Sequence, residues 1–176
     1  MDTYTEVFIF TQSKTFNYAQ NILFLSFSFV AVILGFYLLR KAKRERGWGP
    51  EIVLAGFAFI WATGWGCGQG FGLNRQVNAY SKLTYAYNNH QCAVVEGKVQ
   101  VIHEQSVHGH EQGDIIQVGD KEFEFNYFTD SVGFHQTISH NGVLRDGAYV
   151  RLTYCKNPYP YESGDIIIRV ELRDTK

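Results

Sequence analysis

The chain has 176 residues, 16 basic and 17 acidic side chains and a net charge of −1. This length suits one domain together with an anchor. From residue 75 onward acidic residues outnumber basic ones by thirteen to ten, so we expect no basic surface for nucleic acid.

The N-terminal segment contains one short apolar patch, residues 7–10 (VFIF), among polar residues. The patch is too short to span a bilayer. It either lies on the membrane surface or extends the first helix, and a simple lead-in is the interpretation that we favour.

The longest apolar run covers residues 22–39, eighteen residues without a formal charge. As a helix that rises about 1.5 Å per residue, the run nearly covers a hydrocarbon core of roughly 30 Å. Thirteen of its residues are Ile, Leu, Phe or Val, which favours insertion by on the order of 5 kcal/mol. We therefore predict a transmembrane helix.

Five basic residues follow this run within positions 40–46, and Lys14 alone precedes it. A cleaved signal peptide has the opposite order, with its positive charge before the apolar region, so we interpret the run as a retained anchor. Positive residues in short loops stay on the cytoplasmic side of a membrane. The loop at 40–50 is therefore predicted to be cytoplasmic, and both termini extracytoplasmic.

A second and weaker span is predicted over residues 51–71. Small residues recur every four positions along it, a spacing that lets helix backbones approach closely. We expect packing against the first helix or against another copy of the chain; a glycine-loosened helix that lines a path is the alternative. The two series are Ala58, Ala62, Gly66 and Gly70, and Gly64, Gly68 and Gly72.

Residues 74–91 are polar, with apolar or aromatic side chains at near-helical intervals. The spacing predicts that the second helix continues beyond the bilayer as a stalk or linker. Its tyrosines are expected either at the lipid interface or on the domain that follows. The spaced residues are Val77, Tyr80, Leu83 and Tyr87.

Residues 92–176 alternate apolar and polar side chains, as half-buried β-strands do. Five strands are predicted, near 93–104, 115–118, 121–127, 150–154 and 166–172. The third is expected to bury Phe123, Phe125 and Tyr127. The last is expected to bury Ile166, Ile168, Val170 and Leu172 on one face.

These elements predict a membrane α+β protein, with a two-helix transmembrane hairpin followed by a small antiparallel β-barrel of OB or SH3-like type. Five short strands within some 80 residues favour a closed or nearly closed barrel. A sandwich of similar size is the alternative.

Four stretches of the β-region, VVEGKVQVIHEQ, IIQVGDKEFEFNYF, GFHQTISHNGVLRDG and YVRLTY, carry a resemblance. The chain resembles a group of small uncharacterised bacterial inner-membrane proteins with a two-helix anchor and a C-terminal β-domain. The resemblance covers most of residues 93–173 and implies this architecture without an activity. Asn141 departs from the pattern, because a second glycine is expected there.

Three cysteines are present. Cys67 falls within the second span and is interpreted as a small packing residue. Cys92 and Cys155 lie in the region predicted to be outside the cytoplasm, where a disulfide is permitted. Alternation points Cys155 away from the core, which favours two free thiols over a disulfide.

Imidazole and carboxylate side chains crowd the connection near residues 103–114, and such groups can hold zinc or copper. No H-E-x-x-H or paired cysteine motif occurs, so solvated loop histidines are the preferred interpretation over a divalent metal site. The candidate ligands are His103, His108, His110 and Glu111.

The segment 133–147 is long and irregular between two strands, and loops on a rigid scaffold are common binding sites. In the alternative that we favour, Phe134 and Ile138 close the end of the barrel and the rest is exposed. The candidate contacts for a ligand or partner are Phe134, Gln136, Thr137, His140, Asn141 and Arg145.

No nucleophile elbow, phosphate-binding loop or supported carboxylate pair is found in the sequence, so we expect no catalytic residues and no cofactor. The prediction is a non-enzymatic protein of the bacterial inner membrane. It would display its β-domain outside the cytoplasm and bind a membrane protein or another copy of itself. A small-molecule or metal sensor that signals through the glycine-rich helix is the first alternative, and a metal-dependent hydrolase is the second.

Overall fold

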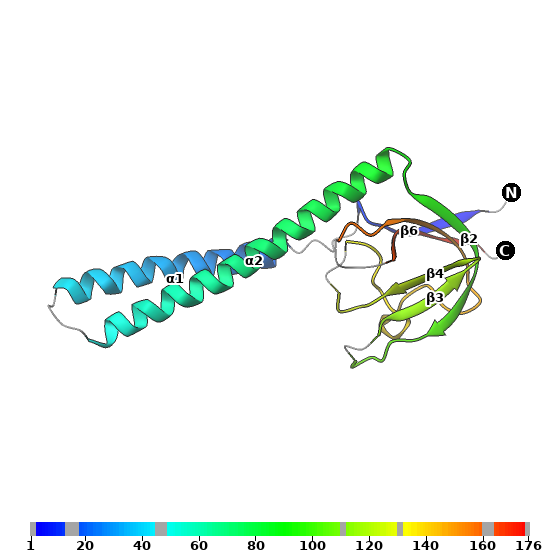
Figure 1. Cartoon of the computed structure of the whole chain (residues 1–176). Helices are drawn as coiled ribbons and strands as arrows, with labels where there is room; N and C mark the ends of the chain where they lie inside the picture. The colour runs from blue at the N-terminus through cyan, green and yellow to red at the C-terminus, as the bar shows by residue number, and fades with distance from the viewer. Residues whose placement is uncertain are drawn as a thin grey trace. The chain divides into compact units, whose positions relative to one another are not determined.

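The computed structural model describes residues 3–12, 18–44, 49–109, 112–129, 132–159 and 164–174. The chain divides into two compact units. One is a helical hairpin within residues 17–75. The other, called the β-domain here, combines the N-terminal segment with the chain from residue 76 onward. Figure 1 shows the elements of both units.

The hairpin contains α1 (Tyr18–Arg44) and the first part of α2 (Pro50–Asn88). Both helices are long and apolar enough to cross a membrane. Large apolar side chains lie exposed on them: Phe29 is 68% and Ile60 is 76% exposed. Helices that are apolar over most of their surface are typical of membrane spans, where lipid covers these side chains. Without a break, α2 runs through the predicted span and the predicted stalk.

The two helices of the hairpin are antiparallel and pack through aromatic and small side chains. The ring of Phe36 in α1 packs edge to face against Phe59 in α2. Phe24 packs in the same way against Trp65, closer to the start of α1. A Cβ at Gly35 would lie 3.0 Å from the Phe59 ring, so glycine is what permits this close approach.

The two small-residue series of α2 differ in their surroundings. Ala62 is buried and Gly66 lies against Ser28 of α1, which places this part of the first series at the helix contact. In contrast, a Cβ added at Gly64, Gly68 or Gly72 would meet no atom of the described residues within 4 Å beyond its own helix turn. Ala58 is half-buried, and a Cβ at Gly70 likewise meets open space there.

The β-domain contains one antiparallel sheet in the order β1-β6-β5-β2-β3-β4. The long strand β2 pairs with β5 through its first half and with β3 through its second half. It thereby carries the sheet from one layer to the other, and the main core lies between these layers (Figure 1). The strands are β1 (Tyr4–Ile9), β2 (Ala93–His103), β3 (Asp114–Val118), β4 (Lys121–Phe125), β5 (Tyr149–Lys156) and β6 (Asp165–Arg173).

The five predicted strands are present, and β1 is an additional one. The interpretation of residues 7–10 as a lead-in is wrong, since these residues belong to β1 and the turn after it. This strand pairs with β6, and the bond from the Phe10 N–H to the Ile168 carbonyl (2.9 Å) continues the ladder. Phe8 packs into the main core, so the N-terminal segment is an integral part of the domain.

The sheet is not closed, so the fully closed form of the predicted closed or nearly closed barrel is wrong. Closure would require the two edge strands, β1 and β4, to pair with each other, and the described residues show no such pairing. An ion pair of 3.3 Å between Lys121 and Asp165 is what joins the starts of β4 and β6. The edge strands are therefore β1 and β4.

A β-bulge in β6 overturns the predicted buried face of this strand. Thr153 pairs with Arg169 whereas Tyr154 pairs with Ile167, so Ile168 is one extra residue. Past the bulge the alternation reverses: Val170 and Ile167 face the main core, while Ile168 faces the opposite side of the sheet.

That opposite side carries a second core, which contains the end of α2. Ala79 and Leu83 are buried there, and Phe10 packs against the rings of Tyr80 and Tyr87. Full burial of a leucine contributes about 1.5–3 kcal/mol, so the stalk is held firmly to the sheet. The stalk tyrosines therefore lie on the domain, one of the two predicted alternatives.

Cys92 and Cys155 form a disulfide. Cys155 points away from the main core, as alternation predicts, but it is 3% exposed because the second core covers this face. The preference for two free thiols is therefore wrong. The disulfide links the chain just after α2 to the middle of the sheet.

Candidate functional site

Two connections leave the sheet at the same end. Asp114 begins β3 and pairs with Phe125, the last residue of β4, and His103 ends β2 beside Ile115. The connection from β2 to β3 and the connection from β4 to β5 therefore start next to each other. Antiparallel pairing alone brings them together.

Asp114 is fully buried beneath these two connections. Its Oδ1 accepts the N–H of Gln105 at 2.8 Å, and its Oδ2 accepts the N–H of Ile138 at 2.7 Å. Bonds to a charged acceptor are roughly twice as strong as neutral ones. One carboxylate thus fixes a point in each connection.

An exposed cluster, called the aromatic patch here, consists of Tyr127, Phe128 and His140. The rings of Tyr127 and His140 are stacked, with centroids 3.7 Å apart and planes 4° apart, and Phe128 meets both edge to face. Tyr127 and Phe128 are each 42% exposed. Because β4 ends at Phe125, the predicted burial of Tyr127 in that strand is wrong.

The His140 ring is held by contacts to its ring nitrogen as well as by the stacking on Tyr127. Its Nδ1 lies 2.8 Å from the hydroxyl of buried Thr137, and the Ser139 hydroxyl is 3.2 Å away. The short helix η1 (Ile138–His140) fixes the spacing of these residues. These contacts hold the imidazole in one orientation.

Asn141 ends η1 with a φ of 64°, in the left-handed region. Asparagine tolerates this conformation better than most residues with a Cβ. It can therefore occupy the position at which the resemblance leads us to expect glycine. The next residue must be glycine, since a Cβ at Gly142 would lie 2.4 Å from the Gln136 carbonyl oxygen.

The predicted contact residues of the segment 133–147 fall into two groups. Phe134 is buried in the main core against Phe8 and Phe125, and Thr137 is buried below the patch. The exposed members are Gln136, Asn141 and Arg145, while His140 is half-buried.

The predicted metal ligands are not brought together in the part of the chain that is described. His103 and His108 are exposed, and His110 and Glu111 lie outside the described residues. Among the described residues, no group of three His, Cys, Asp or Glu side chains has the geometry of a metal site.

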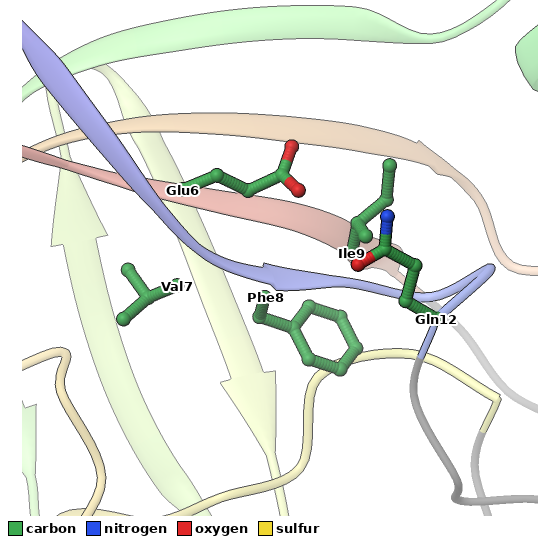
Figure 2. A pocket seen from close by; sticks show the side chains of 5 residues that line it. All are labelled: Glu6, Val7, Phe8, Ile9 and Gln12. Atoms are coloured by element: carbon green, nitrogen blue, oxygen red, sulfur yellow. The ribbon is translucent and has the colours of Figure 1, made fainter.

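A hollow of about 230 Å³ lies along the edge strand β1. Figure 2 shows its lining side chains, with Val7 and Phe8 on one side of the strand and Glu6 and Ile9 on the other. The register shift between Glu6 and Phe8 marks a bulge here. The Glu6 carboxylate is already paired with Arg169 at 2.8 Å, so it is not available to a charged ligand.

The outer face of the sheet carries a polar brace between β1, β2 and β5. The Tyr4 hydroxyl donates to the Glu96 carboxylate, Arg151 Nε pairs with the other Glu96 oxygen at 2.9 Å, and the Arg151 guanidinium lies 4.0 Å from the Tyr4 ring centroid. The bond to Glu96 raises the pKa of Tyr4 to about 12. The same bond, followed by the one from Arg151, lowers the pKa of Glu96.

Four site residues were not identified as contacts by sequence reasoning: Gln105, Asp114, Tyr127 and Phe128. The adjacent aromatic residues after Asn126, directly beyond a strand, were the available signal for the patch. The structural role of Asp114 depends on a contact with a residue 24 positions away, which no local pattern reveals.

Comparisons with protein-family models, with curated proteins and with solved structures give no match to this chain. The geometry of the molecule itself therefore carries the functional argument.

Proposed function

We propose that the protein is a non-enzymatic membrane-anchored binding protein. Its β-domain is displayed on the extracytoplasmic face and binds a protein partner or a second copy through the aromatic patch. The observation that carries the binding role is the pair of exposed rings, Tyr127 and Phe128, fixed beside an oriented His140.

Strand pairing supports a hairpin that crosses the membrane twice. β1 precedes α1 and β6 follows α2, yet the two strands are neighbours in one sheet. This pairing supports a position of the chain before the hairpin and the chain after it on the same side of the bilayer. It favours two crossings over a single one.

The disulfide and the basic loop support the same orientation. Disulfides persist in oxidising compartments, which favours an extracytoplasmic position for Cys92 and Cys155. Lys41, Lys43 and Arg44 lie at the far end of α1, where the charge rule favours the cytoplasm. Two independent features thus agree on the side of the membrane.

The composition of the patch suits a protein partner. Tyrosine, phenylalanine and arginine are enriched at protein interfaces, and rings that are already ordered lose little entropy on binding. Arg145 and Gln136 are exposed on the same connection and can supply polar contacts at the rim.

Self-association in the membrane is supported by the second small-residue series of α2. Gly64, Gly68 and Gly72 form a flat face that no described residue covers. Such a face lets a second helix approach closely. Native mass spectrometry in detergent should show oligomers that Gly68→Leu reduces and that Gly70→Leu, off this face, leaves unchanged. Equal effects of the two substitutions would argue against this face.

Orientation can be tested with a membrane-impermeant thiol reagent on intact cells. Cys92, which is half-buried, should react after treatment with reductant and not before, whereas Cys155 is buried and serves only as its disulfide partner. If labelling requires permeabilised cells, the β-domain lies in the cytoplasm. This result would contradict the proposal that the domain is displayed on the extracytoplasmic face.

Partner binding can be tested by placing a photoreactive amino acid at Phe128 in the full chain within cells. Glu122, exposed on β4, is the matched control position. The proposal expects a discrete cross-linked product at Phe128 that is absent at Glu122. Identical patterns at the two positions would contradict the binding role.

A further inference from the structure

The buried carboxylate of Asp114 is linked to further parts of the surface through the residues that it binds directly. Its Oδ1 bond fixes the backbone of Gln105, and the Gln105 side chain, itself buried, then reaches in two directions. Gln105 Oε1 accepts the N–H of Tyr127 at 3.1 Å, and Gln105 Nε2 donates to the Gly109 carbonyl at 3.3 Å.

The other oxygen of Asp114 leads to the second half of the aromatic patch. Oδ2 holds the first N–H of η1 at Ile138, next to Thr137, whose hydroxyl orients the His140 ring. Tyr127 and His140 are therefore both placed from Asp114, along separate routes. Their face-to-face stacking should therefore depend on both routes.

These bonds lie outside the ladders of the sheet. The N–H groups bound by Asp114 belong to the two connections, and so do the groups bound by Gln105. Loss of the carboxylate should release the connections while the strands keep their own pairing.

We infer that Asp114 is the positioning residue of the binding surface and that it couples the aromatic patch to the β2–β3 connection. The two connections then form one surface, in which a partner that moves Tyr127 or His140 also changes the loop at Gly109. This inference rests on the proposed partner-binding role for its biological meaning, whereas its test needs no partner.

The test uses the full chain in detergent micelles, labelled with ring-¹³C histidine and ¹⁵N glycine. A ring proton of His140 above the Tyr127 ring should resonate upfield of the other histidines, and the Gly109 amide should give one sharp signal. Asp114→Asn keeps the shape of the side chain but turns an NH₂ group toward a backbone N–H, because one acceptor has become a donor.

In Asp114→Asn we expect the upfield shift of His140 to disappear and the Gly109 amide to move, while amide protection in β6 and the disulfide persist. Gln105→Met, which spares the carboxylate, should displace Gly109 and weaken the His140 shift. Asp120→Asn, an exposed carboxylate in the β3–β4 turn, should change neither signal.

An unchanged His140 shift in folded Asp114→Asn would overturn the inference. So would a change at His140 that leaves Gly109 in place, because the two connections would then be independent. Loss of β6 protection in Asp114→Asn would also overturn it, because the carboxylate would then support the whole sheet. None of these outcomes depends on whether a partner exists.

Discussion

Removal of the disulfide is expected to lower the unfolding free energy of the β-domain by about 4 kcal/mol. Cys92 and Cys155 are 63 positions apart, and the chain-entropy relation gives this value for a closed loop of that length. Alanine is the suitable replacement, because a serine at position 155 would add a hydroxyl to the apolar second core.

Hydrogen exchange of peptides from β5 and β6 measures this loss in the full chain. At about 1.4 kcal/mol per factor of ten, 4 kcal/mol corresponds to exchange faster by about 10³ where exchange reports global unfolding. The same double substitution should leave α1 exchange unchanged, since that helix lies in the other unit. Cys67→Ala, at an exposed cysteine of α2, is the matched control. Acceleration below about tenfold would refute the assignment of the disulfide as a major restraint.

Four further outcomes are expected. Phe10→Ala should cost about 3–5 kcal/mol, measured by urea unfolding, because the buried ring joins β1 to the stalk. Since the folded pKa of Tyr4 is about 12 and its ordinary value is 10.0, stability should be full below pH 10 and fall as pH rises toward 12; Tyr4→Phe should lose this alkaline slope. The pKa of Glu96 is lowered, so its contribution should be present above pH 4.5 and lost as pH falls through its folded pKa, an acid limb that Glu96→Gln should flatten. Gly142→Ala should disturb the turn after η1, seen as loss of the His140 ring shift, and an undisturbed ring would show that the turn can yield.

The elements with a strong local pattern could be predicted from the sequence. Hydropathy gave the candidate spans, and alternation gave five of the six strands. The strand β1 has no such pattern, since its six residues include one bulge, and its pairing with β6 spans most of the chain. The strand order could not be predicted without β1, and the pattern of single strands does not show that the edges β1 and β4 stay unpaired.

Errors in side-chain direction had a related cause. One extra residue at Ile168 reverses the alternation of β6, and a bulge is visible only in the pairing with β5. Cys155 is buried because a second core covers the other face of the sheet. The prediction assumed that only one face of the sheet is buried.

The candidate site could be predicted from the sequence only in part. His140 and the segment around it were predicted from irregularity between strands, but the partner ring Tyr127 was assigned to a buried face. Asp114, the carboxylate beneath them, accepts hydrogen bonds from residues of both connections. These bonds can form only in the folded domain, so the sequence does not reveal them.

The pairing of β1 with β6 sets an order of events in biosynthesis. The ribosome makes β1 before either helix and β6 after both, so the N-terminal strand has no pairing partner in the sheet until the C-terminal strand has been made. A chain stalled before β6 would leave the apolar side chains of β1 uncovered, and this exposure would distinguish incomplete copies from finished ones.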